Sequence, residues 1–150
     1  KGNNILSIGE EVKNVRSYID IQLMMHDYNF DVEIEIPDKM KEYATLNLIL
    51  QPLVENAIDH GIDLKEDGRG KISIEGKEQK DDIYLIVSDN GIGMEQEKAQ
   101  QMLTKKSKGY GLRNVKERIE LFFGTDYGVT VTSKPRHGTT ICIHMPKRYL

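Results

Sequence analysis

The segment 51–61 carries four polar side chains within six positions, namely Glu55, Asn56, Asp59 and His60. On a helix these positions, i, i+1, i+4 and i+5, share one broad face beside an apolar stripe, and Asn56 and His60 lie one turn apart. The amide oxygen of Asn56 suits Mg²⁺, which prefers oxygen ligands and keeps phosphate and water in its shell. The carboxylate of Glu55 can accept a proton or orient a nucleophile. The cluster therefore predicts a ligand site, with a solvated helix face as the alternative.

A second candidate is the segment Asp89-Asn90-Gly91-Ile92-Gly93, which follows a strongly apolar run. Asn-Gly after a strand is a common tight-turn signal, but a turn does not require the aspartate. A carboxylate at the end of a buried strand is costly unless it is paired, and accepting a hydrogen bond from the amino group of adenine would offset that cost. Gly91 and Gly93 would let the backbone approach the flat base. The segment predicts an adenine-reading turn, with an ordinary turn as the alternative.

A third candidate, Gly109-Tyr110-Gly111-Leu112, lies at a predicted helix start. Free N–H groups and the helix dipole at such a position favour an anion. Gly-x-Gly alone is a weak signal and does not match the longer Rossmann or P-loop patterns. Lys105, Lys106, Lys108 and Arg113 can neutralise a polyphosphate, although a solvated basic loop is the plain alternative. The order of the three segments suggests an ATP site.

Composition excludes several classes of protein. The 150 residues suit one domain, and 21 Lys and Arg nearly balance 24 Asp and Glu, which argues against nucleic acid binding through bulk charge. The single cysteine, Cys142, cannot form an internal disulfide and fits a reducing cytosol. No apolar run approaches the roughly 20 residues of a spanning helix, so we expect no direct membrane contact. Because the chain begins with Lys1 rather than Met, we expect it to be a piece of a longer protein.

The first half of the chain predicts two helices and a strand. Ser7 and Glu10 have the spacing of a capping box and precede an apolar stripe of helical period that ends near Asp27. Apolar and charged residues alternate over 30–36, which predicts a strand with one wet face. Helical spacing over 46–58 predicts a second helix, which Pro52 should kink or restart.

The second half predicts the rest of a layered α+β domain. We expect strands over 71–75 and 83–88, a short helix over 95–103, a helix from Leu112 to Phe122 that Gly124 ends, and a hairpin of strands 129–133 and 139–145. The strand over 83–88 is almost entirely apolar, which predicts a central place in the sheet.

In this order and separation, the three segments resemble the N, G1 and G2 boxes of the GHKL ATPases, the superfamily of histidine kinases, DNA gyrase B, MutL and the large heat-shock ATPase chaperones. The run 48–57, with His60-Gly61-Ile62, is most similar to the catalytic domain of LytS/YesM-type bacterial sensor histidine kinases. Residues 109–115 and Glu117-Arg118-Ile119 are similar to the second glycine box and following helix of that subfamily. Residues 12–35 resemble its pre-catalytic segment, so the resemblance covers nearly the whole chain.

The resemblance implies an α+β fold of the Bergerat type, a two-layer α/β sandwich whose mixed sheet is covered by helices on one face. Residues 1–28 would be a pre-catalytic helical segment packed on the domain, and residues 29–150 the GHKL catalytic and ATP-binding domain. ATP would lie between a helix and a mobile lid of residues 95–108.

The resemblance also implies roles for individual residues. Glu55 would be the acid–base residue, Asn56 would bind Mg²⁺, Asp89 would hold the adenine amino group, and Thr139 in the closing box Gly138-Thr139-Thr140 would support Asp89. The other residues implied to bind ATP are His60, Gly91, Gly93, Lys108, Gly109, Gly111 and Leu112. Many histidine kinases have Lys where this chain has Asp59, so lysines of the lid, Arg113 or the metal must supply the missing charge.

The activity implied is transfer of the γ-phosphoryl group of ATP to a histidine on an upstream dimerisation domain that this chain lacks, with a response regulator downstream. The chain would be a cytoplasmic domain of a parent protein anchored in the cell membrane. Two alternatives remain: an ATP-gated interaction module without productive transfer, favoured by Asp59, and an anti-sigma-type serine kinase of the same fold.

Overall fold

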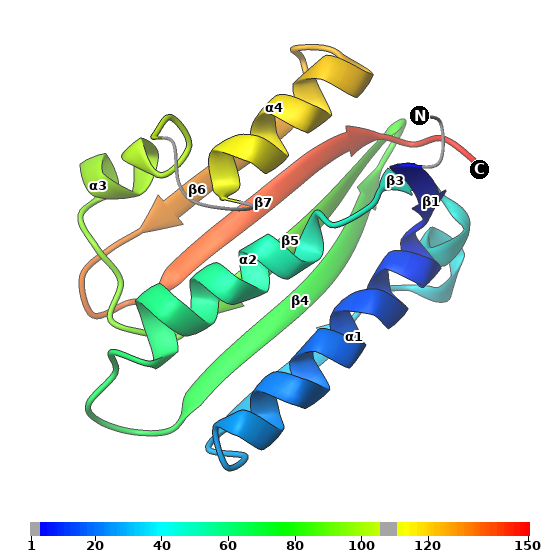
Figure 1. Ribbon diagram of the computed structural model, residues 1–150. Helices are drawn as coiled ribbons and strands as arrows, with labels where there is room; N and C mark the ends of the chain where they lie inside the picture. The colour runs from blue at the N-terminus through cyan, green and yellow to red at the C-terminus, as the bar shows by residue number, and fades with distance from the viewer. Residues whose placement is uncertain (1–3, 106–110) are drawn as a thin grey trace.

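A five-stranded mixed sheet and the helices on one of its faces form the two layers of the computed structural model, which describes residues 4–105 and 111–150 (Figure 1). In sheet order the strands are β2 (Phe30–Glu35), β4 (Gly70–Gln79), β5 (Asp82–Asp89), β7 (Thr139–Pro146) and β6 (Gly128–Ser133). β2 runs parallel to β4, and the other neighbouring pairs are antiparallel. The central place predicted for the apolar strand, β5, is confirmed.

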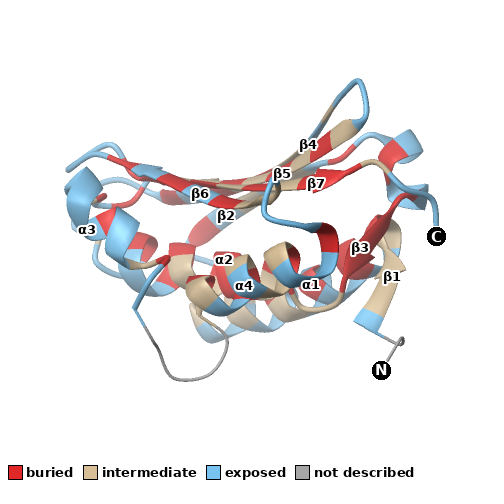
Figure 2. Cartoon of the chain, turned by 90° about the horizontal axis from the view of Figure 1, so that it is seen from above, coloured by how far each residue is buried: buried red, intermediate tan, exposed pale blue. Residues whose placement is uncertain are grey.

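The main helices are α1 (Ile8–Met25), α2 (Leu50–Ala57), α3 (Gln96–Gln101) and α4 (Leu112–Phe123). In Figure 2, α1, α2 and α4 all lie on the same side of the sheet. A π-helical turn, η3 (Ile58–Ile62), continues α2, and a 3₁₀ helix, η2 (Asp38–Glu42), follows β2. β1 (Ile5–Ser7) and β3 (Ala44–Leu46) form a separate antiparallel pair. The expected fold class, a mixed sheet covered by helices on one face, is confirmed.

The core lies between these layers because alternate strand residues point toward the helices. β5 buries Ile83, Leu85 and Val87 against the helices, and β7 buries Ile141 and Ile143 in the same way. The apolar stripe of α1 belongs to this same cluster of buried residues. Burial of one face of each strand therefore fixes the strand register, since a slip by one residue would expose the apolar set.

The capping box predicted at the start of α1 is confirmed. The Ser7 hydroxyl accepts a hydrogen bond from the Glu10 amide at 3.1 Å, and the Glu10 carboxylate accepts one from the Ser7 amide at 3.2 Å. Gly124 ends α4 with a φ of 109°, also as predicted.

The helix predicted over 46–58 forms only from Leu50 onward, and the expected restart at Pro52 is wrong. Leu46 belongs to β3, and α2 begins at Leu50. Pro52 therefore lies in the first turn, where a backbone N–H has no partner within the helix, so its missing donor breaks nothing.

Candidate functional site

The polar cluster of segment 51–61 lies on two different kinds of helix. Glu55 and Asn56 are half-buried on α2, whereas Asp59 and His60 are exposed on η3. The amide of Asp63 donates to the carbonyl of Ile58 at 2.9 Å, an i→i+5 bond that widens the last turn. The 3.6-residue period ends at Ala57, so Asn56 and His60 lie on opposite sides of the change from α-helix to π-helical turn.

Glu55 has neighbours on two elements. The side-chain amide of Gln51, one turn earlier on α2, donates to the Glu55 carboxylate at 3.4 Å. Tyr18 faces the same helix from α1: burial, with the charges of Glu55 and Asp59, raises its pKa to about 12. Sequence analysis missed Tyr18, although its place beside the apolar stripe of α1 is the signal that could have found it.

Asp89 ends β5 as a carboxylate held by backbone groups. Its Oδ1 accepts the amide of Gly91 at 2.8 Å, and the amide of Thr139 on β7 also favours its charged form. Burial outweighs both contacts and raises the pKa of Asp89 to about 6. Among the described residues, no lysine, arginine or histidine forms an ion pair with it. Asp89 therefore keeps capacity to accept a further hydrogen bond.

The Asp89 turn packs backbone to backbone on η3. A Cβ added to Gly61 would lie 2.6 Å from Asp89 Oδ1, and a Cβ added to Gly91 would overlap the backbone of Gly61. Gly91 was predicted to let the backbone approach a base. In the structure, a side chain at position 91 is excluded by the backbone of Gly61 instead. Two segments that sequence analysis treated separately thus form one wall.

The β6–β7 hairpin supports the other side of this turn. Gly93 and Gly138 have φ values of 65° and 75°, and a Cβ on either would overlap a backbone carbonyl, that of Lys134 or of Asp89. The hydroxyl of Thr139 pairs with that of Ser133 at 2.8 Å. The predicted support of Asp89 by Thr139 therefore comes from the backbone amide, not from the hydroxyl.

The anion site expected at the start of α4 is described only in part. Lys108 and Gly109 lie outside the described residues, as does Lys106. Gly111 is the N-cap of α4, and within residues 4–105 and 111–150 no side chain caps this helix. Arg113, expected to face a polyphosphate, instead pairs with Glu117 at 2.7 Å.

The start of the predicted lid is tied to the sheet. The Gln96 side chain on α3 donates to the Val131 carbonyl and accepts from the Ser133 amide, both at 2.9 Å. Ala99 and Leu103 are buried. Residues 95–105 thus include a segment anchored on β6, while 106–108 lie outside the described residues.

The described residues do not form a metal site with several protein ligands; the predicted ligand is the single side-chain amide of Asn56. In the part of the chain that the structure describes, no group of three or more His, Cys, Asp or Glu side chains could hold a metal ion. A magnesium ion that takes most of its ligands from phosphate and water needs no such group.

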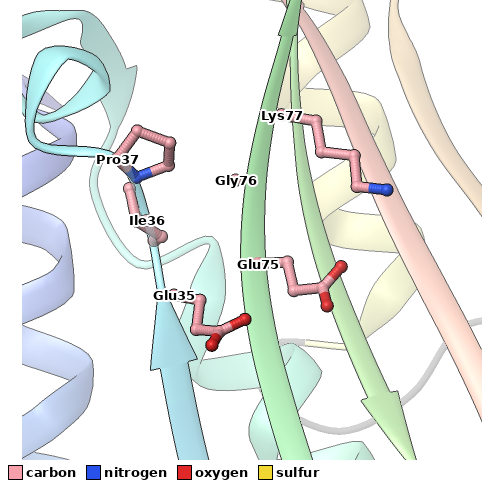
Figure 3. A pocket seen from close by; sticks show the side chains of 6 residues that line it. All are labelled: Glu35, Ile36, Pro37, Glu75, Gly76 and Lys77. Atoms are coloured by element: carbon pink, nitrogen blue, oxygen red, sulfur yellow. The ribbon is translucent and has the colours of Figure 1, made fainter.

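A separate hollow lies at the far end of β2 (Figure 3). It has a volume of about 450 Å³ and is lined by Glu35, Ile36, Pro37, Glu75, Gly76 and Lys77. None of the predicted site residues lines it, and its paired carboxylates, Glu35 and Glu75, disfavour a polyphosphate.

Comparisons with known proteins agree with the motifs. The sequence model of the family described as histidine kinase-, DNA gyrase B- and HSP90-like ATPase matches residues 42–149. Sensor histidine kinase YesM of Bacillus subtilis (strain 168) is 34% identical over 145 residues, 97% of this chain and 24% of that protein. Sensor histidine kinase BtsS of Escherichia coli (strain K12) is 30% identical over 146 residues, 97% of this chain and 25% of that protein. The chain thus spans about a quarter of the length of these relatives.

Solved structures show the same fold. The nucleotide-free catalytic domain of histidine kinase ThkA superposes with a TM-score of 0.72 at 19% identity, covering 97% of both chains. ThkA in complex with the response regulator TrrA superposes with a TM-score of 0.69 at 17% identity, covering 95% of this chain and 41% of that one. At these identities the likeness concerns the fold alone.

Gly91→Ala should destabilise the fold by about 1–3 kcal/mol, because the added methyl group would overlap the Gly61 backbone. Urea unfolding measures this loss. Gly76→Ala is the matched control, since the nearest atoms there belong to the flexible side chain of Met40. Equal stability of the two variants would contradict the tight Gly61–Gly91 contact.

Asp89→Asn should raise the unfolding free energy of the ligand-free chain at pH 7.5 by roughly 1–3 kcal/mol. Between pH 3.8 and about 6 the folded chain keeps the Asp89 proton that the unfolded chain releases, so this group lowers stability as pH rises through that window. Asparagine does not titrate, so the stability gain should be small at pH 4 and complete above pH 6. Urea unfolding over this pH range measures it, with the exposed Asp126→Asn as control. A less stable Asp89→Asn at pH 7.5 would refute the raised pKa.

Proposed function

We propose a function for a chain that belongs to the family of histidine kinase-, DNA gyrase B- and HSP90-like ATPases: it is the ATP-binding catalytic domain of a sensor histidine kinase. Family membership and the layered fold expected from the three motifs are both confirmed. The observation that carries the proposal is the Asp89 carboxylate, which is half-buried and held by backbone amides rather than by a cation. Such a group suits the exocyclic amino group of adenine.

The proposed ATP site runs from Asp89 to α2. Asp89 accepts the adenine amino group, and the wall formed by Gly61 and Gly91 places α2 next to the base. Asn56 lies toward the phosphate end, where Mg²⁺ would add the positive charge that Asp59 cannot supply. The N–H groups that follow Gly111 bind phosphate oxygens at the start of α4. The remaining residues of the proposed site are His60, Gly93, Leu112 and Thr139.

Glu55 is the proposed catalytic residue. Its half-buried position beside Gln51 and Tyr18 holds a carboxylate one residue from Asn56, the proposed metal ligand. There it can accept the proton of the attacking imidazole or orient it toward the γ-phosphate. Positioning and charge neutralisation supply most of the rate enhancement in phosphoryl transfer.

The proposed partners lie outside this chain. The phosphoryl acceptor is a histidine on an upstream dimerisation domain, and a response regulator acts downstream; one structural neighbour, ThkA, has been solved with a response regulator. Residues 1–28 would serve as the pre-catalytic segment and 29–150 as the catalytic unit, in a parent protein anchored in the membrane. No helix within the described residues is long and apolar enough to cross a membrane.

One experiment separates this function from an ATP-gated interaction module. The chain is incubated with Mg²⁺ and γ-labelled ATP, with and without the histidine-bearing domain of the parent protein. Acid-labile label on that domain establishes histidine phosphorylation. ATP binding without any label transfer would favour the module, which Asp59 also favours because it brings negative charge to the phosphate end.

Asp89→Asn should weaken ATP binding by about 10- to 100-fold, because the amide cannot offer adenine a charged acceptor. Isothermal calorimetry with Mg·ATP measures the loss. Asp126→Asn makes the same chemical change on an exposed turn and should bind normally. Unchanged affinity in Asp89→Asn would remove the adenine contact from the proposal.

Glu55→Ala should leave the ATP dissociation constant within about twofold while slowing phosphoryl transfer by about 100-fold or more, since general bases contribute on this scale. Single-turnover transfer to the supplied domain gives the rate. Glu42→Ala, at an exposed position on η2, is the control. Transfer by Glu55→Ala at the control rate would exclude Glu55 as the base.

A further inference from the structure

We propose that Glu11 and Arg118 are positioning residues that hold the start of α2 and thereby place Glu55 and Asn56 for the metal and the phosphates. This inference rests on the proposed ATP site. Neither residue lies in the N-box or glycine-rich turns that first suggested ATP binding, and both act through the backbone of residues 47–50.

α2 begins without a cap of its own. Its N-cap residue is Ile49, whose side chain cannot accept a hydrogen bond, and Pro52 supplies no N–H in the first turn. Glu11 of α1 takes the place of the cap: its carboxylate accepts the amides of Leu48, Ile49 and Leu50 at 3.1, 2.9 and 3.0 Å. A negative charge at a helix N-terminus also interacts favourably with the positive end of the helix dipole. This contact therefore fixes where α2 starts.

Arg118 of α4 holds the same turn from the other side. Its guanidinium donates to the carbonyl of Leu48 at 3.2 Å and to the carbonyl of Asn47. Leu48 has a φ of 57°, a conformation that costs a non-glycine residue energy and persists only where its surroundings hold it. Here Glu11 binds its amide and Arg118 binds its carbonyl. We call these two side chains, with the backbone of residues 47–50, the Glu11–Arg118 clamp.

Glu11 is the buried side of the clamp and Arg118 is half-buried, so the carboxylate has little freedom to adjust. Glu11 is only 1% exposed. Burial raises the pKa of Glu11, while the three amides and the charge of Arg118 oppose that rise and favour the carboxylate. Removing Glu11 would leave the amides of Ile49 and Leu50 without this partner, and removing Arg118 would leave the carbonyls of Asn47 and Leu48 without theirs, so the position of α2 depends on both.

The proposed metal ligand lies within reach of any movement at the clamp. Gly61 is held by its packing on the Asp89 turn. Asn56 lies five residues before it, or about 7 Å along the helix axis, so a tilt of about 10° about that contact moves Asn56 by about 1.2 Å. Displacements near 1 Å are enough to impair a catalytic site. Asp89 is on β5, and its turn stays in contact with Gly61 when the start of α2 shifts, so the adenine end of the site should keep its geometry. The clamp therefore predicts a selective effect at the metal and phosphate end.

The test measures ATP affinity of the full chain by calorimetry, with Mg²⁺ and with EDTA, for the wild type, Glu11→Gln, Arg118→Gln and the milder Arg118→Lys. Mg²⁺ should strengthen ATP binding by the wild type. In Glu11→Gln and Arg118→Gln, the increase in ATP affinity caused by Mg²⁺ should be about 10-fold smaller than in the wild type, a loss typical of removing a group that orients a metal ligand. Both variants should bind ATP normally in EDTA. Arg118→Lys, which can still reach one carbonyl, should lose less.

Tyr43→Phe controls for stability alone. It removes a hydrogen bond from a buried hydroxyl to Glu78, remote from the proposed site, and should lower the thermal unfolding midpoint without changing the effect of Mg²⁺. The positioning role would be overturned if the variants lost ATP affinity equally with Mg²⁺ and with EDTA. It would also be overturned if Glu11→Gln and Arg118→Lys lost no ATP affinity. A wild type that binds no ATP would overturn the proposed function instead, and a wild type indifferent to Mg²⁺ would overturn the metal role of Asn56; either result also removes the basis of this inference.

Discussion

A buried carboxylate at the start of α2 is the contact on which the helical layer depends. Glu11 brings negative charge into the core, which is costly unless hydrogen bonds replace the lost water. Three backbone amides replace it, and the nearby charge of Arg118 also favours the carboxylate. Since these groups come from α1, α2 and α4, the requirement to satisfy one charge fixes three helices against one another at a single point.

Asp89, a half-buried carboxylate, has a different role from Glu11. Burial raises the pKa of both groups, but three amides and the nearby charge of Arg118 oppose this rise at Glu11, whereas two backbone amides oppose it at Asp89. Glu11 is satisfied by the protein itself and serves the fold. The Asp89 carboxylate has fewer hydrogen-bond partners, so its charge lowers the stability of the ligand-free chain. A ligand that donates a hydrogen bond to it would offset this cost. Incomplete satisfaction of a buried group is thus a physical mark of a binding residue.

The parts of the fold that follow from local pattern were predictable, as the Ser7–Glu10 capping box and the apolar β5 show. The contacts that assemble the site were not, because they join residues far apart in sequence. The π turn after Ala57 accompanies the packing of Gly61 on Gly91, which no helical period reveals. Asp89 and the N-box cluster were each recognisable, but their shared wall and the Glu11 contact required the tertiary structure.

The pairing of β2 with β4 is parallel, and α2 lies in the connection between them. Parallel neighbouring strands need such a long crossover, which here runs from Glu35 to Gly70. Closing this loop costs chain entropy before the hydrogen bonds between β2 and β4 can form. The helix bearing Glu55 and Asn56 thus belongs to the segment that must close before β2 can pair with β4. Opening of that edge would therefore remove one wall of the nucleotide site, which makes nucleotide binding a reporter of the domain's own integrity.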